Sequence, residues 1–246
     1  AIQHGDIHRN NFNYRFTQAD LVKDLLPELT GVWGTSTSEF LVRNSCYPKE
    51  DISIVGQLRT DVIPALKAQF AKNNHRQKFT VLFASQPFFN QDLRKRMYVD
   101  VLKASKELPE ISFIHKPHPG ETNWSFFDEM DKENSHRIER TDQDLYELLA
   151  QSTVVVTGFS TVGVEAVYFE KDLIVMDYQK EDLAGYVKEN VALQATSHEE
   201  LIDFIKHLSS GSELLKADFK HDYVARRTHQ IDGLASKRLK EAIEAL

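Results

Sequence analysis

Short apolar runs rich in β-branched and aromatic residues recur along the chain, and longer amphipathic segments separate them. Runs of this length that are apolar on both faces are typical of buried strands in a parallel sheet. A weaker candidate of the same kind covers residues 136–140. The expected strands are 31–34, 52–56, 79–85, 111–115, 153–158 and 173–178.

The segments between these strands carry apolar residues at helical spacing. The clearest is 197–208, which opens with the capping-box sequence Ser-His-Glu-Glu and has an apolar stripe of Leu201, Phe204, Ile205 and Leu208. The other predicted helices are 91–106, 142–151 and 161–170. Strands that alternate with helices in this way predict an α/β fold, a Rossmann-like doubly wound parallel sheet.

Two domains are expected, with the boundary at residue 65. Residues 1–65 repeat the strand and helix pattern less regularly, and 66–76 look like a polar connector. Beyond Gly211 the pattern is helical, and a closing helix would carry its apolar residues on one side: Ala235, Leu239, Ala242 and Leu246. The second domain is therefore predicted to cover residues 66–246.

Composition narrows the functional classes only slightly. The net charge of −7 is spread without long blocks, which argues against a nucleic-acid partner. The single cysteine excludes an intramolecular disulfide and suits a reducing compartment. No apolar run approaches the roughly 18 residues of a membrane span. The sequence begins AIQHGD without methionine, and we expect it to be part of a longer chain.

Strand 111–115 leads into the sequence HKPHPGE, which places a histidine between two prolines just beyond a strand end. Ligands of open α/β sheets bind beyond the carboxyl ends of the strands. Prolines stiffen the backbone around His118, so its imidazole could hold a phosphate or protonate a leaving group. The alternative is a structural turn. A metal site formed by His115, His118 and Glu121 is disfavoured, because the spacing fits no zinc motif.

Other polar residues follow neighbouring strands. Ser160 and Thr161 open a predicted helix, where backbone amides can bind phosphate; the alternative for Ser160 is an ordinary helix cap. Glu165, one turn further on, could accept hydrogen bonds from a ribose or be a solvated carboxylate. Ser85 stands in the polar turn after strand 79–85, and Lys116 adds positive charge to the His118 turn.

Two further candidates lie in the first domain. His4 follows the strand-like start of the chain. Arg59, in the sequence GQLRTD, could contact a phosphate near an interdomain hinge or pair with a carboxylate. A structural role is expected for Asp61.

Five short motifs occur in an order that resembles bacterial surface-polysaccharide transferases of the GT-B fold. The likeness spans nearly all of residues 1–246 and is closest to CDP-glycerol glycerophosphotransferases (teichoic-acid polymerases) and capsule polysaccharide transferases. Bacterial sialyltransferases share a similar His-Pro motif and a serine motif. The motifs are QHG, GQLRTD, KPHPGE, TGFSTVGVEA and IDGLASKRL.

This resemblance implies metal-independent transfer of a glycosyl or glycerophosphoryl group, without a cofactor. The donor would be CDP-, CMP- or UDP-linked, and the acceptor a polysaccharide or a lipid-linked molecule. Residues 66–246 would be the donor domain, and residues 1–65 the last part of the acceptor-side domain. A cytoplasmic location is implied, with attachment to the inner face of the membrane through regions outside this sequence as an open alternative.

The resemblance also assigns roles to residues. His118 would bind the donor phosphate and assist the departure of the nucleotide, and Ser160 and Thr161 would hold phosphate. His4 would be the general base for the acceptor hydroxyl, and Arg59 the hinge arginine. Two departures are clear: Glu165 stands where the teichoic-acid enzymes carry aspartate, and glutamine rather than tryptophan precedes His4.

Two rival functions remain open. A non-hydrolysing UDP-N-acetylglucosamine 2-epimerase shares the fold but needs carboxylates beside the sugar ring, and the sequence offers no convincing set. A non-catalytic nucleotide- or glycan-binding module is the second rival.

Overall fold

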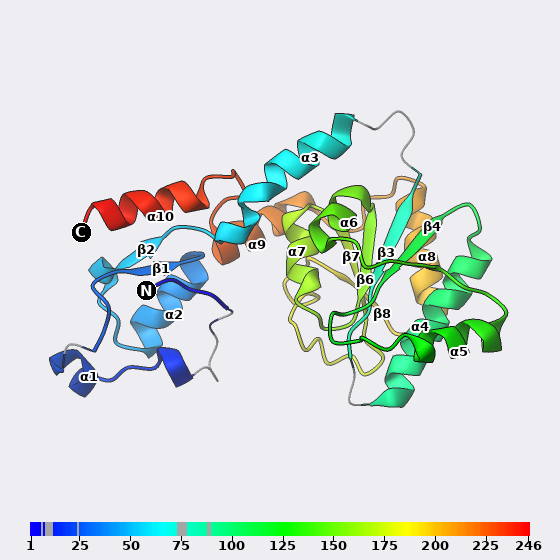
Figure 1. Ribbon diagram of the computed structural model, residues 1–246, viewed down its shortest axis with the longest axis horizontal. Helices are drawn as coiled ribbons and strands as arrows, with labels where there is room; N and C mark the ends of the chain where they lie inside the picture. The colour runs from blue at the N-terminus through cyan, green and yellow to red at the C-terminus, as the bar shows by residue number, and fades with distance from the viewer. Residues whose placement is uncertain (6, 8–11, 24, 73–77, 88–89) are drawn as a thin grey trace. The chain divides into compact units, whose positions relative to one another are not determined.

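The computed structural model describes residues 1–5, 7, 12–23, 25–72, 78–87 and 90–246. It divides into two compact units (Figure 1). The first unit comprises Ala1–Ala65 together with His221–Leu246, and the second comprises Leu66–Lys220.

The second unit is built on a six-stranded sheet in which every neighbouring pair is parallel. The strand order β5-β4-β3-β6-β7-β8 is that of a doubly wound Rossmann sheet. This confirms the predicted fold class. The strands are β3 (Thr80–Ala84), β4 (Ser112–Lys116), β5 (Glu139–Arg140), β6 (Val154–Thr157), β7 (Asp172–Met176) and β8 (Leu193–Ala195).

Helices cover both faces of this sheet, as its fully buried strands require (Figure 1). One face packs in a large core against α4 (Gln91–Glu107), α5 (Ser125–Asn134) and α8 (His198–Ser209). The opposite face carries α6 (Leu145–Gln151) and α7 (Val162–Tyr168). All four predicted helices of this unit are present, whereas α5 and β8 were not predicted.

The start of α8 differs in one detail from the predicted capping box. Ser197 Oγ accepts a hydrogen bond from the Glu200 amide at 3.3 Å, as expected. The Glu200 carboxylate instead accepts from the amide of Thr196, one residue before the cap, at 2.7 Å. Both bonds of a capping box are therefore present at the amino end of α8, but Glu200 bonds to Thr196 instead of to the cap residue Ser197.

The first unit has a smaller sheet and a smaller core. Strands β1 (Thr30–Val32) and β2 (Ile52–Ile54) are parallel, and Ile2 adds a parallel bridge to β1. Its short helical turns are η1 (Phe12–Tyr14), η2 (Lys49–Asp51) and η3 (Leu58–Val62). Its α-helices include α1 (Gln18–Val22), α2 (Thr35–Asn44) and α10 (Ala235–Glu244).

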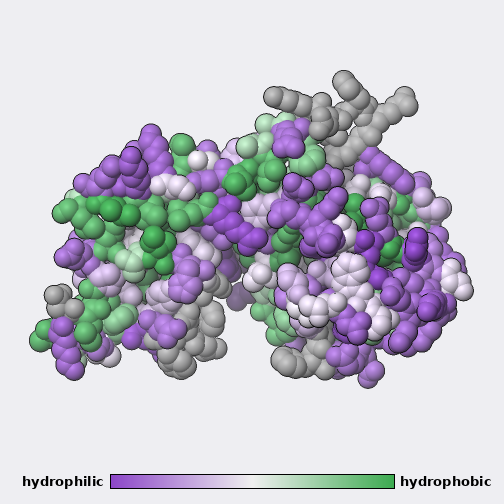
Figure 2. All heavy atoms as spheres, in the orientation of Figure 1, coloured by the Kyte–Doolittle hydropathy of each residue, from purple (hydrophilic) through white to green (hydrophobic). Residues whose placement is uncertain are grey.

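This unit leaves many large apolar side chains exposed, and Figure 2 shows hydrophobic residues gathered on its visible face. One buried core cluster among its described residues consists of Ile7, Val32, Leu41 and Tyr47. The exposed apolar side chains include Ile2, Val22, Leu25, Leu234, Ile243 and Leu246.

The end of the chain corrects the predicted domain limits. Residues 66–246 were assigned to the second domain, but His221–Leu246 belong to the first unit. Polar contacts hold this segment in the first unit: Asp61 caps α10 by accepting from the amides of Ala235 and Ser236, both at 2.8 Å. Arg238 Nε also donates to the Val55 carbonyl at 2.9 Å. The structural role expected for Asp61 is therefore confirmed.

Two helices span the boundaries between the units. The predicted connector 66–76 is helical in its first part, because α3 runs from Ile63 to Lys72; residues 73–77 lie outside the described part of the chain. Helix α9 (Ala217–Thr228) continues from the second unit into the first. Both crossings are therefore helical rather than extended.

Candidate functional site

The carboxyl ends of β3, β4 and β6 lie side by side at one edge of the six-stranded sheet. Strand β3 stands between β4 and β6, and all three run parallel. The strand order reverses between β3 and β6, and open α/β sheets bind ligands at such a switch point. The structure thus brings Ser85, Lys116, His118 and Ser160 to one edge.

His118 lies on a tight turn directly after β4. The Glu121 amide donates to the His118 carbonyl oxygen at 2.7 Å, and the His118 amide donates to Glu121 Oε2 at 3.1 Å. The Gly120 amide donates to His118 Nδ1 at 3.0 Å. A neutral imidazole that accepts at Nδ1 carries its proton on Nε2. The exposed His118 ring therefore has Nε2–H as its donor for a ligand.

Glu121 is the buried centre of this turn, with only 3% of its side chain exposed. Arg94 of α4 approaches Oε1 through Nε at 2.9 Å and Nη2 at 2.8 Å. Ser85 Oγ donates to Oε2 at 2.6 Å. The carboxylate thus ties together the end of β3, the turn after β4 and the first turn of α4.

The sequence points to Glu121 only as a member of a disfavoured metal site, and it gives no indication of Arg94. One signal was available: a carboxylate three residues after His118 can reach back to the His118 amide across a tight turn. The approach of Arg94 could not be inferred, because it depends on how α4 packs.

Ser85 and His115 continue the polar network into the core. The proton of Ser85 Oγ is given to Glu121, so its contact with His115 Nε2 at 2.9 Å is one in which the imidazole donates. His115 is completely buried and packs on the rings of Phe83 and Phe127. Burial, together with the nearby guanidinium groups of Arg140 and Arg94, holds the pKa of His115 well below 6.5. His115 is therefore neutral.

The same bond bears on the predicted phosphate role of Ser85. The residue is 8% exposed, and its hydroxyl proton is directed at Glu121. A phosphate contact through this proton would require the bond to Glu121 to break.

The segment after β6 is held by contacts of Ser160. Its Oγ accepts from the Val162 amide at 3.3 Å, and its carbonyl accepts from Tyr186 Oη at 2.8 Å. The helix predicted over 161–170 is shorter, because α7 covers Val162–Tyr168. Thr161 is its exposed N-cap residue and makes no side-chain cap. The cap-like bond supports a structural contribution from Ser160.

Three more polar residues stand near this edge. Lys116 is the last residue of β4 and is half-buried, and Glu165 is buried on the first turn of α7. Gln86, which follows Ser85, was not singled out from the sequence. It is 5% exposed, and among the described residues its Oε1 has no hydrogen-bond partner.

His4 and Arg59 belong to the first unit. His4 is exposed, with Tyr14 Oη 3.3 Å from its Nδ1. The preceding Gln3 is buried: its Oε1 accepts from the Trp33 amide at 2.8 Å, and its Nε2 donates to the Gly5 carbonyl at 2.9 Å. Gln3 thus fixes the backbone around this histidine. Arg59 is exposed in η3.

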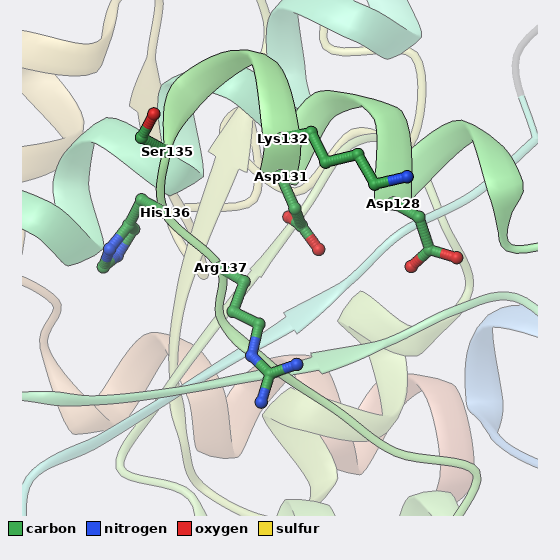
Figure 3. A pocket seen from close by; sticks show the side chains of 6 residues that line it. All are labelled: Asp128, Asp131, Lys132, Ser135, His136 and Arg137. Carbon is green, nitrogen blue, oxygen red and sulfur yellow. The ribbon is translucent and has the colours of Figure 1, made fainter.

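A surface hollow lies elsewhere on the second unit (Figure 3). It is bordered by α5 and by the segment just before β5, so it lies beside the amino end of that strand. Two of its carboxylates, Asp128 and Asp131, pair with Arg140 at 2.7 and 2.8 Å. Its lining residues are Asp128, Asp131, Lys132, Ser135, His136 and Arg137. None of the predicted site residues belongs to it.

Within the described ranges, no group of three histidine, cysteine, aspartate or glutamate side chains is arranged to hold a metal ion. Among the same residues, no helix has the length and apolar character needed to cross a membrane.

Comparison with solved structures identifies proteins of similar fold. The wall teichoic acid polymerase TagF in a crystal soaked with CDPG matches with a TM-score of 0.62 at 15% identity, over 89% of this chain and 57% of that one. UDP-GlcNAc 2-epimerase from Neisseria meningitidis, bound to UDP-GlcNAc, matches with a TM-score of 0.65 at 13% identity, over 98% of this chain and 67% of that one. No family model and no curated protein matches.

These likenesses confirm the predicted GT-B type of fold, which the polymerase and the epimerases share. The chain spans 57% of the length of the polymerase structure. At this level of identity the comparison concerns the fold.

Proposed function

We propose that the Leu66–Lys220 unit binds the phosphates of a nucleotide-activated donor at the carboxyl edge of its sheet. The observation that carries this proposal is the His118 turn: it follows β4 beside the switch point, and its exposed imidazole has a donor at Nε2. Of the structures with a similar fold, the polymerase was soaked with CDPG and the Neisseria epimerase is bound to UDP-GlcNAc, both nucleotide-linked molecules. A GT-B transferase is the function that this arrangement supports best.

The proposed reaction transfers a glycosyl or glycerophosphoryl group to a cell-surface polysaccharide acceptor. The acceptor hydroxyl oxygen attacks the anomeric carbon of a sugar donor, or the distal phosphorus of a glycerol donor. The bond to the nucleotide phosphate oxygen breaks, and the nucleotide leaves with that electron pair. His4 is proposed to take the hydroxyl proton, and Arg59 to contact phosphate.

Charge develops on the leaving phosphate, and the enzyme must stabilise it there. His118 Nε2–H and the Lys116 ammonium are proposed to do so, without a metal ion. Ser160, Thr161 and the backbone amides after β6 are proposed to bind the donor phosphates, with Ser85 in the wall of the site. Glu165 is proposed to accept hydrogen bonds from the sugar or ribose.

The first test is nucleotide binding. Thermal shift and calorimetry with CDP, CMP, UDP and GDP should reveal binding that EDTA does not weaken. His118→Ala should raise Kd about 10- to 100-fold, because a hydrogen bond to a charged group is worth about 1.5–3 kcal/mol. The double variant Ser160→Ala/Thr161→Ala should also bind more weakly.

His207→Ala is the matched control, because His207 is an exposed histidine near the end of α8. It should bind nucleotide as the unmodified protein does. Unchanged affinity in His118→Ala, or a large loss of affinity in EDTA, would contradict the proposed phosphate site.

An epimerase is the second candidate, because the Neisseria epimerase matches over 98% of the chain. The two reactions differ in what happens to the nucleotide. A non-hydrolysing epimerase inverts one sugar carbon and leaves the nucleotide attached, whereas a transferase releases it. Incubation with UDP-GlcNAc, followed by NMR of the sugar protons and by assay of free UDP, separates them. A protein that binds nucleotide but does neither would be a binding module.

A further inference from the structure

We propose that Glu121 is a positioning residue: clamped by Arg94 and Ser85, it holds the His118 turn so that Nε2–H faces the donor site. This inference rests on the proposed function, because it assigns to Glu121 the task of orienting the phosphate-binding imidazole. It concerns a side chain that is itself too buried to meet the donor.

Glu121 closes the turn on both sides of His118. Its amide donates to the His118 carbonyl at 2.7 Å, and its Oε2 accepts from the His118 amide at 3.1 Å. These bonds fix the backbone on either side of the imidazole. They also bring the Gly120 amide within 3.0 Å of His118 Nδ1, the contact that selects the Nε2–H tautomer.

The Glu121 carboxylate cannot rotate away from the turn. Both oxygens are occupied, Oε1 by two nitrogens of Arg94 and Oε2 by Ser85 and the His118 amide. Arg94 is held in turn, because its guanidinium lies 3.9 Å over the centre of the Phe126 ring. Asn90 caps α4 by accepting from the Asp92 and Leu93 amides, which fixes the helix turn that carries Arg94.

Ser85 links this clamp to the rigid core. Its hydroxyl donates to Glu121 and accepts from the fully buried His115, which sits in the strand β4 that leads into the turn. Burial keeps the pKa of His115 well below 6.5, so no positive charge forms there to disturb the Arg94 pair. The turn is thus anchored to β3, β4 and α4 together.

Replacement of Glu121 by glutamine tests this role, because it keeps the shape and removes one acceptor. If the glutamine amide nitrogen takes the place of Oε1, it faces the donor nitrogens of Arg94. If it takes the place of Oε2, it faces the Ser85 hydroxyl and the His118 amide, which also donate. Either orientation breaks part of the clamp. Glu129→Gln, at an exposed position of α5, is the matched control.

The decisive readout is the tautomer of His118, measured in the absence of ligand. Long-range proton–nitrogen NMR at about pH 8, where ordinary imidazoles are neutral, reports which nitrogen carries the proton. His118→Ala assigns the signals. We expect Nε2–H in the unmodified protein and in Glu129→Gln, and signals shifted towards the average of both tautomers in Glu121→Gln. The Kd for CDP should rise about tenfold in Glu121→Gln.

A lower melting temperature of Glu121→Gln with an unchanged His118 spectrum would overturn the proposal, because Glu121 would then only stabilise the fold. If Glu121→Gln does not fold, Ser85→Ala removes a single bond of the clamp and should move the same signals, to a smaller extent. An unchanged His118 spectrum in that variant would equally overturn it.

The two proposals fail differently. If the unmodified protein binds no nucleotide, the proposed function fails, whereas the tautomer measurement still decides the role of Glu121. If nucleotide binds but the His118 spectrum is unaffected by Glu121→Gln, only the positioning role fails.

Discussion

His115 shows how one buried polar residue can serve the site without touching a ligand. It is enclosed by aromatic rings, with centroids of Phe83, Tyr98 and Phe127 within 5.2 Å of its own. Its Nε2–H is used by Ser85, and among the described residues its Nδ1 has no hydrogen-bond partner. Such a site strongly favours the uncharged imidazole.

This neutrality predicts a specific pH dependence of stability. Burial lowers the pKa of His115 well below 6.5 in the folded protein. As the pH falls below about 6.5, the His115 imidazole therefore takes up a proton in the unfolded chain but not in the folded protein. The stability contributed by the neutral form is therefore complete above about pH 6.5. It should be lost as pH falls towards the folded pKa, by up to about 1.4 kcal/mol per pH unit.

Urea unfolding of the unmodified protein and of His115→Phe between pH 7 and pH 5 measures this contribution. His115→Phe should lose less stability on acidification than the unmodified protein does, whatever its absolute stability. His207→Phe, at an exposed position, should keep the original slope. Parallel curves for His115→Phe and the unmodified protein would contradict the assignment of a buried neutral imidazole.

At this scale the sequence revealed the histidine turn but not its support. The two prolines around His118 and the preceding apolar strand indicate a stiffened histidine at a strand end, with a phosphate contact and a structural turn both open. Arg94 lies 27 positions from Glu121, and their pairing depends on how α4 packs on the sheet. No local pattern in the sequence specifies that distance.

At the scale of elements, α7 and the loop after β7 lock together through Tyr186. The Tyr186 ring is 2% exposed and packs directly on Gly163, while its hydroxyl donates to the Ser160 carbonyl. Asp177 organises the same loop by accepting from the Asp182 amide and from Gln194, bonds that lower its pKa. The segment that carries Ser160 is thereby held from both sides.

The close packing predicts that Gly163→Ala is destabilising. A methyl group there would stand 2.5 Å from Tyr186 Cε2, and overpacking of this kind typically costs about 1–3 kcal/mol. In a Tyr186→Ala background the clash is absent, and alanine is about 1 kcal/mol better than glycine within a helix. Gly163→Ala should then be neutral or stabilising.

A double-mutant cycle of unfolding free energies checks this coupling. The same cost for Gly163→Ala in both backgrounds would show that Tyr186 does not pack on the helix as described.

The elements were predicted best where their apolar pattern was long and regular. Helices α4 and α8 and strands β3, β4, β6 and β7 were all expected close to their observed limits. Helix α5 was missed, although Phe127 and Met130 are its buried residues, because its apolar positions are few and acidic residues surround them. Strand β8 has only three residues, too few for a recognisable pattern.

At the scale of the whole molecule, the chain combines a complete doubly wound unit with a smaller unit that its own carboxyl-terminal segment rejoins. The sequence predicted the first of these from strand and helix alternation. It did not predict that His221–Leu246 belong to the smaller unit. This depends on contacts such as that between Asp61 and Ala235 at the start of α10, which are 174 positions apart.

The proposed function requires nucleotide phosphates to bind at the carboxyl ends of β4 and β6. Titration of the ¹⁵N-labelled protein with CDP and UDP, followed through its amide spectrum, tests this requirement. We expect the largest shifts at the amides of His118, Gly120 and Glu121 and of Gly158–Val162. Shifts confined to the hollow around Ser135–Arg137 or to the first unit, or no shift at saturating nucleotide, would contradict it.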